Sequence, residues 1–441
     1  MQRLDRLPVT PVQIFWVSLL GLGFLIENFD NGVFALLAPA IRDEWGLSLG
    51  RIGLITSAVF LGMFVGAVGG GRLSDRYGRK PVLIWSSVFY SAASLMSALA
   101  PNFEVLLASR VLTGIGVQAT SGAIMVYLSE MFPSASRGRF FSVVTFCGYA
   151  ASPIASLVAL AIVPTGEGAW RWVFALGAVG VVIAVAVAAA LPESVRWLVS
   201  HGKTEEADVI VDRLEARAGR LGPLEPALPV PPAAPTNSFR DLLRPEYARR
   251  LAVLGISFAI TLFCMYGFIS WAPTILVDRG LSQSQALAIT TAVGLGSLIS
   301  PLLLFPVVDR IERKTTILVA GSVAGIGMMI FGSAHDALLS TVAGVIVAVG
   351  ITAMTTSFYT YLPEVFPTAV RGAGAGMING FGRIAGFASG ITVAAVYSSQ
   401  GSATLYFLLG SGLVVMGVLT AALGPRTTNR SLEVSSGTSP K

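Results

Sequence analysis

The chain has 441 residues, of which 54% are hydrophobic and only 12% are charged, and its formal net charge is +6. A soluble domain carries roughly 25% charged residues, so the composition excludes a water-soluble globular protein. The 2 cysteines lie in separate apolar stretches, and we expect neither a disulfide nor a metal site.

Twelve apolar stretches run along the chain, each long enough to cross a bilayer. A helix needs about 20 residues to span the hydrocarbon, and a backbone inside it satisfies its hydrogen bonds only as a helix or a closed barrel. We expect an all-α polytopic membrane protein with twelve transmembrane helices. The predicted spans lie near residues 14–40, 51–72, 81–100, 104–128, 140–163, 170–191, 249–276, 283–307, 315–334, 338–361, 373–397 and 402–424.

The distribution of Lys and Arg orients these spans. With the N-terminus in the cytoplasm, 24 of the 30 basic residues fall on the cytoplasmic side, four lie outside, and Arg110 and Arg383 lie within spans. This asymmetry follows the positive-inside rule. We therefore expect a multi-pass protein of the inner (plasma) membrane with both termini in the cytoplasm. The rule also accounts for the net positive charge without nucleic-acid binding.

One interval of 234 residues relates two halves of the chain. The segments that recur at this offset are 75–80 at 309–314, 127–133 at 361–367, 38–39 at 272–273 and 46–48 at 280–282. Repeated matches at a single offset indicate two copies of one unit, and paired membrane halves bind cargo between them near the midplane. The expected parts are two pseudo-symmetric six-helix bundles, a cytoplasmic linker loop and a tail, at 1–191, 249–424, 192–248 and 425–441.

The linker begins with a charged stretch, Thr204–Arg217, that has Ile210 and Leu214 on one side. This pattern predicts an amphipathic helix. The Pro-rich stretch that follows it predicts an extended connection. We find no residues in the linker that indicate chemistry.

The loop between the second and third spans has a spaced pattern of Gly, Asp and basic residues, Gly71-Arg72-Leu73-Ser74-Asp75-Arg76-Tyr77-Gly78-Arg79-Lys80. Here the chain resembles the major facilitator superfamily, whose members carry a Gly-x-x-x-Asp-x-x-Gly-Arg-Lys loop, and the resemblance covers the whole chain. It implies the major facilitator fold and a transporter rather than an enzyme. In that superfamily the loop locks the inner ends of neighbouring helices in one state, which implies this role for Asp75 and Arg79. Topology-setting charge alone would explain the Lys and Arg but not the Asp and Gly spacing.

Further charged residues at the cytoplasmic helix ends resemble the inner charge network of the sugar-porter-like branch of the superfamily. Carboxylate–guanidinium pairs there can form in one conformation and break in the other. The residues expected in this conformational gate are Asp75, Arg79, Glu130, Arg137, Glu193, Arg196, Asp309, Arg313, Glu364 and Arg371.

The fifth span bears on the direction of transport. Drug/proton antiporters of the superfamily carry a Gly-x-x-x-Gly-Pro-x-x-Gly-Gly pattern there. The corresponding segment, 148–157, keeps Pro153 but lacks three of the glycines. The comparison of patterns therefore disfavours efflux.

The first span holds two carboxylates, Glu27 and Asp30, three residues apart and so on one helical face. Ionisable residues inside a membrane are costly and usually functional, which makes both acids candidates to hold and release a proton. Their spacing from Pro39 resembles the Asp-Gly-x-Asp element of the aromatic acid:proton symporter family, with Glu27 replacing the first Asp. The resemblance favours Asp30, although either acid can titrate. The alternative is that Asp30 only binds polar atoms in the bundle.

Arg110 opens the segment 110–116 of the fourth span, which resembles the superfamily's helix-four element. There an Arg lies near the first-helix acid and assists proton release. A guanidinium beside Asp30 or Glu27 would make a switchable proton site. The alternative is that Arg110 extends to the outer interface. The repeat positions of Asp30 and Arg110 are Cys264 and Gly344, so these charges belong to one half only.

Arg383 lies near the middle of the eleventh span. A cation this deep requires an anionic partner, and the planar guanidinium suits a carboxylate. The spacing from Arg371 resembles both the aromatic acid symporters and the animal organic anion transporters, which place an Arg here that is implicated in anion binding. The alternative is a structural bridge from Arg383 to Glu27 or Asp30.

Aromatic side chains in several spans suit flat substrates by stacking, and polar side chains between them can supply hydrogen bonds. The residues expected at the substrate site are Arg383, Phe29, Gln118, Tyr149, Tyr266, Trp271, Thr355, Phe358, Tyr359 and Asn379.

The sequence thus predicts a proton-coupled importer of a small organic carboxylate, with Asp30, Glu27 and Arg110 in proton coupling. We expect an aromatic or heteroaromatic acid such as benzoate or nicotinate, and aliphatic carboxylates and sugars stay open. No phosphate-binding loop occurs, so we expect no nucleotide and no cofactor. We expect a monomer in the lipid bilayer. The alternatives are an organic-cation or drug transporter that uses the helix-one carboxylates and, less favoured because the tail is short, a ligand-sensing receptor.

Overall fold

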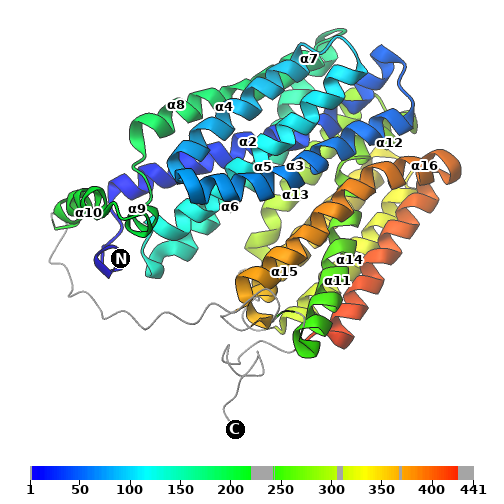
Figure 1. Cartoon of the computed structure of the whole chain (residues 1–441). Helices are drawn as coiled ribbons and strands as arrows, with labels where there is room; N and C mark the ends of the chain where they lie inside the picture. The colour runs from blue at the N-terminus through cyan, green and yellow to red at the C-terminus, as the bar shows by residue number, and fades with distance from the viewer. Residues whose placement is uncertain (1, 220–241, 243, 305–310, 367–369, 426–441) are drawn as a thin grey trace. The chain divides into compact units, whose positions relative to one another are not determined.

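The computed structural model describes residues 2–219, 242, 244–304, 311–366 and 370–425 (Figure 1). Among these residues the regular elements are helices. In chain order they are α1 (Gln2–Asp5), α2 (Pro11–Trp45), α3 (Leu49–Tyr77), α4 (Arg79–Ala98), α5 (Phe103–Met131), α6 (Ser134–Ile162), the 3₁₀ turn η1 (Val163–Thr165), α7 (Trp170–Ala175), the 3₁₀ turn η2 (Leu176–Val179), α8 (Gly180–Ala190), α9 (Val195–Ser200), α10 (Thr204–Ala218), α11 (Pro245–Ile269), α12 (Ala272–Asp278), α13 (Gln283–Leu304), α14 (Arg313–Ser333), α15 (Ala337–Val365) and α16 (Arg371–Leu423).

The predicted spans fall on helices, but two of them are divided. The sixth, 170–191, forms α7, η2 and α8, and the seventh, 249–276, forms α11 and α12. Ten helices of the described residues are long and apolar enough to cross a membrane by length and composition. In addition, α13 covers the predicted eighth span as far as Leu304. The last two spans are joined in α16, which is kinked between them at the non-helical Gly401, with φ 77°. The charged stretch of the linker forms α10, as predicted.

The chain forms two compact units, which we describe separately. Unit 1 comprises Met1–Val33, Leu61–Ser152 and Arg171–Pro232, and unit 2 comprises Phe34–Phe60, Pro153–Trp170 and Ala233–Lys441. Residues of α2, α3 and α6 therefore contribute to both units. The predicted domain boundaries at 191 and 249 stay a prediction.

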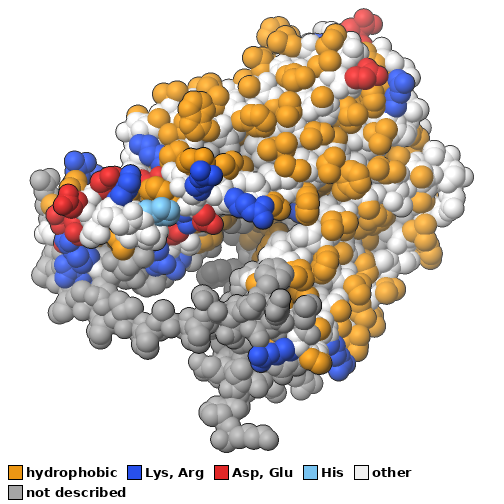
Figure 2. All heavy atoms as spheres, in the orientation of Figure 1, with side chains coloured by type: hydrophobic (Ala, Val, Ile, Leu, Met, Phe, Trp, Pro, Cys, Tyr) orange, Lys and Arg blue, Asp and Glu red, His pale blue; other side chains and the backbone are white. Residues whose placement is uncertain are grey.

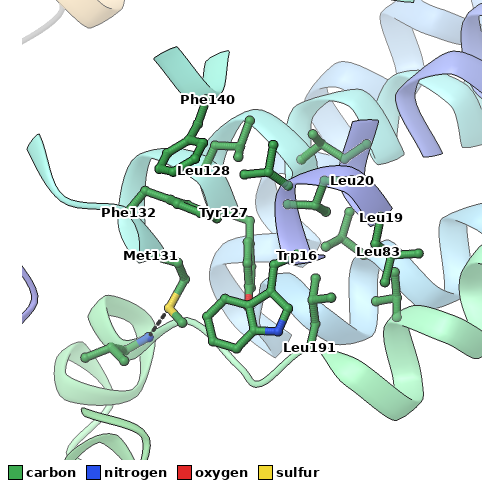
Figure 3. Close-up of a cluster of buried hydrophobic side chains, with 14 of the residues drawn as sticks. Trp16, Leu19, Leu20, Leu83, Tyr127, Leu128, Met131, Phe132, Phe140 and Leu191 are labelled. Atoms are coloured by element: carbon green, nitrogen blue, oxygen red, sulfur yellow. Dashed lines mark hydrogen bonds between the residues drawn. The ribbon is translucent and has the colours of Figure 1, made fainter. Parts of the chain in front are cut away.

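A core of buried apolar side chains joins the long helices of unit 1 to α9 and α10 (Figure 3). Polar atoms at its edge are paired. The indole Nε1 of Trp16 donates to the Ala190 carbonyl at 3.1 Å, and the Tyr127 hydroxyl donates to the Pro192 carbonyl at 3.0 Å. The Val195 N–H contacts Met131 Sδ at 3.3 Å. These contacts fix the start of α9 against the ends of α5 and α8.

The N-terminal segment is also attached to this core. Leu4 and Leu7 are each 4% exposed and pack in the cluster that includes α10. The Arg3 guanidinium donates to Glu215 at 2.7 Å, and Arg6 donates to the same carboxylate at 2.7 Å. We call Arg3, Leu4, Arg6, Leu7 and their contacts on α10 the N-terminal latch.

Helix α5, which carries Arg110, packs closely on α3 through a row of small residues. A Cβ atom at Gly62 would lie 2.0 Å from the Val111 carbonyl oxygen, and one at Gly66 would lie 2.3 Å from the Ile115 carbonyl oxygen. Glycines at a spacing of four let two membrane helices approach closely. These glycines therefore let α5 pack closely on α3 next to Arg110.

In unit 2, an arginine caps the end of α14. Arg279 Nη1 donates to the Phe331 carbonyl at 2.8 Å, and Arg279 Nη2 donates to the Gly332 carbonyl at 2.6 Å. A helix end leaves carbonyls without helical partners, and a nearby cation stabilises them. The rings of Phe331, Phe268 and Tyr406 pack edge to face beside this cap.

Hydrophobic side chains cover the long helices on the face shown in Figure 2, whereas charged side chains gather near α9 and α10. In unit 1, Trp85 on α4 and Trp172 on α7 each expose 71% of their surface. Large apolar surfaces of this kind mark contact with another apolar phase. The exposed apolar side chains agree with the membrane location of the chain.

Candidate functional site

The structure brings Asp30 of α2 and Arg110 of α5 together inside unit 1. Asp30 is 0% exposed and Arg110 is 1% exposed. Arg110 Nη2 donates to the backbone carbonyl of Asp30 at 2.8 Å, whereas Nη1 lies 3.7 Å from the carboxylate Oδ1. The guanidinium also lies 5.3 Å from the ring centroid of Phe174. Arg110 is therefore held mainly by the backbone, and its contact with the carboxylate is the longer one.

Ser94 of α4, which sequence reasoning missed, is the closest hydrogen-bond partner of this carboxylate. Its Oγ lies 2.5 Å from Asp30 Oδ1 and 2.9 Å from the carbonyl oxygen of Phe174 on α7. Gly177 in η2 packs against both residues, since a Cβ atom there would lie 2.2 Å from Ser94 Oγ. A pair of glycines, Gly177 and Gly180, inside one predicted span is the signal that could have indicated this close contact.

Glu27 lies one turn before Asp30 and has a different partner. It is 0% exposed, and the Ser121 hydroxyl of α5 donates to its Oε1. Asp30 Oδ2 has no hydrogen-bond partner within the described part of the chain. This oxygen is a place where a proton can bind without displacing another contact.

Arg383 of α16 lies in unit 2, where it is half-buried. Its Nη1 is 3.5 Å from the hydroxyl of Tyr266 on α11, a long contact. The Tyr266 ring packs on Phe60, with the centroids 4.4 Å apart. Glycines on both sides of Arg383 permit this arrangement, because a Cβ atom at Gly386 would lie 3.0 Å from the Phe60 ring. We call Arg383, Tyr266 and Phe60 the Arg383 site.

The other expected substrate residues differ in how far they are enclosed. Trp271 and Phe358 are 1% and 0% exposed, so protein atoms surround them in this structure, whereas Tyr359 is 48% exposed. The residues that are buried or half-buried in unit 1 are Phe29, Gln118 and Tyr149. Two further residues of unit 2 bond within their own helices, namely Thr355 to the Ile351 carbonyl and Asn379 to the Ala375 carbonyl.

Four expected gate residues of unit 1 form what we call the inner charge cluster. Arg79 Nε and Nη2 donate to the two carboxylate oxygens of Glu130 at 2.8 Å each, and Nη2 lies 3.2 Å from Asp75 Oδ1. Glu193 Oε1 accepts the backbone N–H of Arg79 at 2.9 Å. Gly78 has φ 104°, and a Cβ atom there would lie 2.3 Å from Glu193 Oε2, which explains the glycine of the loop. Paired hydrogen bonds between Arg and carboxylate are strong, so the cluster ties the start of α4 to α5.

The corresponding residues of unit 2 are less closely paired. Arg313 Nε lies 3.4 Å from Glu364 Oε1, compared with 2.8 Å in the equivalent contact of unit 1. Asp309 lies outside the described residues, and the Arg371 side chain is not among those described. The gate role of this group stays a prediction.

Two further gate arginines of unit 1 lie on α6 and α9. Arg137 Nη2 donates to the Phe132 carbonyl at 3.3 Å, next to the end of α5. Arg196 is half-buried on α9. In this conformation Glu130 contacts Arg79 of the preceding loop, and Arg137 contacts backbone.

An ionic contact that the sequence did not indicate lies within unit 2, at the ends of α2 and α12. Arg42 Nη1 of α2 donates to Asp278 Oδ1 at the end of α12 at 2.5 Å, and the Tyr397 hydroxyl of α16 donates to Asp278 Oδ2 at 3.0 Å. We call Arg42, Asp278 and Tyr397 the outer clasp. In the same unit, Ser57 Oγ of α3 donates to the Phe387 carbonyl of α16 at 2.7 Å. The first-half helices α2 and α3 are thus joined here to α12 and α16.

Comparison with known proteins identifies the family. Residues 20–390 match the model of the Major Facilitator Superfamily. The chain belongs to this superfamily. The expected fold class and the expectation that the chain is a transporter and not an enzyme are thereby confirmed, as is the multi-pass membrane location.

Relatives and solved structures agree with this family. The chain is 32% identical to YyaJ of Bacillus subtilis, provisionally described as a metabolite transport protein, over 98% of this chain and 96% of the relative. It is 28% identical to the niacin transporter NiaP of Acinetobacter baylyi over 98% of both chains. The crystal structure of a D-xylose-proton symporter has a TM-score of 0.75 at 19% identity, and the match covers 95% of this chain and 99% of that chain. At that identity the structural likeness concerns the fold alone.

Proposed function

We propose that the protein takes up a small organic carboxylate, an aromatic or heteroaromatic acid, together with a proton by alternating access. The observation that carries the cargo class is the Arg383 site, in which a half-buried guanidinium lies 3.5 Å from the Tyr266 hydroxyl, and the Tyr266 ring packs on Phe60. A guanidinium binds a carboxylate with paired hydrogen bonds, and aromatic rings stack on a flat ring. A relative described as a niacin transporter supports the same class.

Proton coupling is assigned to unit 1, with Asp30 as the group that binds the proton. Its carboxylate is buried, lies 3.7 Å from Arg110 and has one oxygen that accepts no hydrogen bond within the described residues. When Asp30 is ionised, Arg110 compensates its charge. When a proton binds, this attraction weakens, and the pair responds to the proton gradient. Glu27, which Ser121 contacts, is the second candidate.

The inner charge cluster, with Arg313 and Glu364, is proposed to stabilise one end state of the transport cycle. Contacts present in only one conformation shift the equilibrium toward it by their differential free energy. The excess of Lys and Arg near this end supports its location in the cytoplasm, with both termini. We propose that the protein works as a monomer in the inner (plasma) membrane.

The competing function is transport of an organic cation or drug by the helix-one carboxylates. The contact of Asp30 with Arg110 speaks against it, because the guanidinium already compensates that carboxylate. The Arg383 site also repels a cation. This alternative would gain support if a cation, and no carboxylate, bound to the protein.

Thermal-shift measurements on the purified protein test the cargo class. The ligands are nicotinate, benzoate, 4-hydroxybenzoate and lactate, with nicotinamide and choline as uncharged and cationic controls. We expect one aromatic acid to stabilise the wild type and Arg383→Ala to weaken its binding about tenfold or more, as the loss of a hydrogen bond between charged groups implies. Arg51→Ala, which removes an exposed arginine of unit 2, should leave binding unchanged. Stabilisation by choline that Arg383→Ala leaves intact would overturn the carboxylate assignment.

A further inference from the structure

The hydroxyl of Ser94 lies between two acceptors but carries one proton. One acceptor is Asp30 Oδ1 at 2.5 Å, and the other is the Phe174 carbonyl oxygen at 2.9 Å. Both distances are within hydrogen-bond range. Since a serine hydroxyl donates only once, Ser94 binds strongly to one of the two acceptors at a time.

The second acceptor belongs to a break in the sixth span. Phe174 is the penultimate residue of α7, and the chain then continues as the 3₁₀ turn η2 before α8. Short 3₁₀ stretches inside a helix often mark a hinge. Here the break is packed against Asp30 and Ser94, because a Cβ atom at Gly177 would lie 2.7 Å from Asp30 Oδ1 and 2.2 Å from Ser94 Oγ.

The charged and titratable groups around Asp30 come from the helices packed on it. Arg110 of α5 makes the ion contact, and Glu27 lies on the same helix, one turn away. The Tyr90 hydroxyl of α4 is also buried. From α7 and η2, the Phe174 carbonyl contacts Ser94, and a Cβ atom at Gly177 would lie 2.7 Å from Asp30 Oδ1. Ser94 is thus the hydroxyl that joins the carboxylate to the sixth span.

We propose that Ser94 is a positioning residue for proton coupling, whose hydroxyl donates to Asp30 when that carboxylate is ionised and to the Phe174 carbonyl when Asp30 is protonated. The inference rests on the proposed role of Asp30 as the proton-binding group. The incoming proton comes from solvent and binds at Oδ2, and Ser94 keeps its own proton. An ionised oxygen is the stronger acceptor, so loss of the charge releases the hydroxyl to the backbone. Protonation thereby adds a hydrogen bond at the α7–η2 break.

Infrared difference spectra of the reconstituted full-length protein, recorded across pH, test this assignment. The band of the protonated carboxyl group reports directly on Asp30 and is assigned by its loss in Asp30→Asn. In Ser94→Ala the ionised form loses a hydrogen bond. The pH midpoint of the Asp30 band should therefore rise by about one to two units.

A matched control and a second variant separate this role from packing. Ser97→Ala removes another fully buried hydroxyl of α4, which bonds to Ser109 and the Ala93 carbonyl, and it should leave the midpoint unchanged. Gly177→Ala places a methyl group against Ser94 Oγ and should shift the midpoint in the same direction as Ser94→Ala. Neither shift follows from a loss of stability alone.

The outcomes distinguish the two proposals. An Asp30 band whose midpoint is the same in the wild type and Ser94→Ala overturns the role of Ser94 and leaves the proton site in place. A carboxyl band that persists unchanged in Asp30→Asn overturns both, because Asp30 then does not bind the proton. A raised midpoint in Ser94→Ala, with Ser97→Ala unchanged, supports the inference.

Discussion

Equivalent repeat positions hold polar and charged residues in the first half of the chain and mainly apolar residues in the second half. In the first half, Asp30, Ser94, Arg110 and Gly177 form a buried polar site. The residues 234 positions later in the second half are Cys264, Met328, Gly344 and Ser411. Cys264 and Met328 are as buried as their counterparts, with 2% and 0% exposure.

The second half has an apolar groove in this region. It has a volume of about 520 Å³, lies between α11 and α16, and is lined by Cys264, Leu408 and Ser411 among others. Leu408 and Ser411 are the repeat positions of Phe174 and Gly177. One half therefore folds with apolar residues where the other holds an ion pair. The duplicated scaffold does not require these charges, which supports a functional role for them in the first half.

Arg110→Ala is expected to have the largest effect, because it leaves the Asp30 carboxylate buried without its cation. Removing one partner of a buried ion pair costs about 3–5 kcal/mol. We expect a lower melting temperature and no uptake driven by a pH gradient. Adding Asp30→Asn to the same chain should recover most of the melting temperature but not the uptake. A melting temperature equal to that of the wild type in Arg110→Ala would show that the pair does not contribute to stability.

The reciprocal change introduces a carboxyl group at the repeat position. Cys264→Asp should lower the free energy of unfolding by about 2 kcal/mol, since Cys264 is buried and the repeat position of Arg110 is a glycine. Adding Gly344→Arg should not restore stability, because a Cβ atom there would lie 2.7 Å from Val293. Cys264→Ser is the control. Equal thermal stability of the Asp and Ser variants would contradict the contrast between the halves.

Glu44 and Asp278 occupy another pair of repeat positions and also differ in their partners. Glu44 Oε2 accepts the indole N–H of Trp170 at 2.6 Å, whereas Asp278 accepts Arg42 in the outer clasp. A double-mutant cycle of Arg42→Ala and Asp278→Asn should give a coupling free energy of about 0.2–1 kcal/mol, the range for exposed ion pairs. A cycle of Arg42→Ala with Glu44→Gln is the comparison. Equal coupling in the two cycles would remove the distinction between these positions.

The smallest expected effect concerns the N-terminal latch of the first half, whose contribution to stability depends on pH. Hydrogen bonds from Arg3 hold the pKa of Glu215 at about 2, below its ordinary value of 4.5. A carboxylate with a lowered pKa stabilises the folded state above its ordinary pKa, and this contribution is lost as the pH falls toward the lowered value. Hydrogen exchange of residues 2–8 should thus show protection that persists from neutral pH to about pH 5 and falls below it.

A substitution separates the latch from general acid unfolding. Arg3→Ala should remove this protection at neutral pH, while Arg213→Ala, which removes an exposed arginine of α10, should not. Protection of the N-terminal segment that is the same in Arg3→Ala and in the wild type would show that its apolar side chains hold it without the ion contacts.

The sequence predicted most of the fold, because long apolar stretches and the positive-inside rule depend on local composition. It also indicated that Asp30 and Arg110 form one site, through the resemblance of their segments. It missed Ser94 and the break at 176–179, because a serine in a membrane helix has no distinctive pattern and the span 170–191 carries no helix-breaking proline, only the glycines Gly177 and Gly180. The outer clasp was missed for a related reason. Its residues are separated by 236 and 119 positions, and tertiary packing alone brings them together.

Uptake of radiolabelled nicotinate into proteoliposomes, with and without a pH gradient, tests the central claim most directly. We expect a gradient that is acidic outside to accelerate accumulation in the wild type. Asp30→Asn should abolish the acceleration while leaving exchange of nicotinate across the membrane, and Arg383→Ala should abolish both. Accumulation that responds to the gradient equally in the wild type and Asp30→Asn would contradict the assignment of the proton to the first half. Nicotinate transport unaffected by Arg383→Ala would contradict the assignment of the carboxylate to the second.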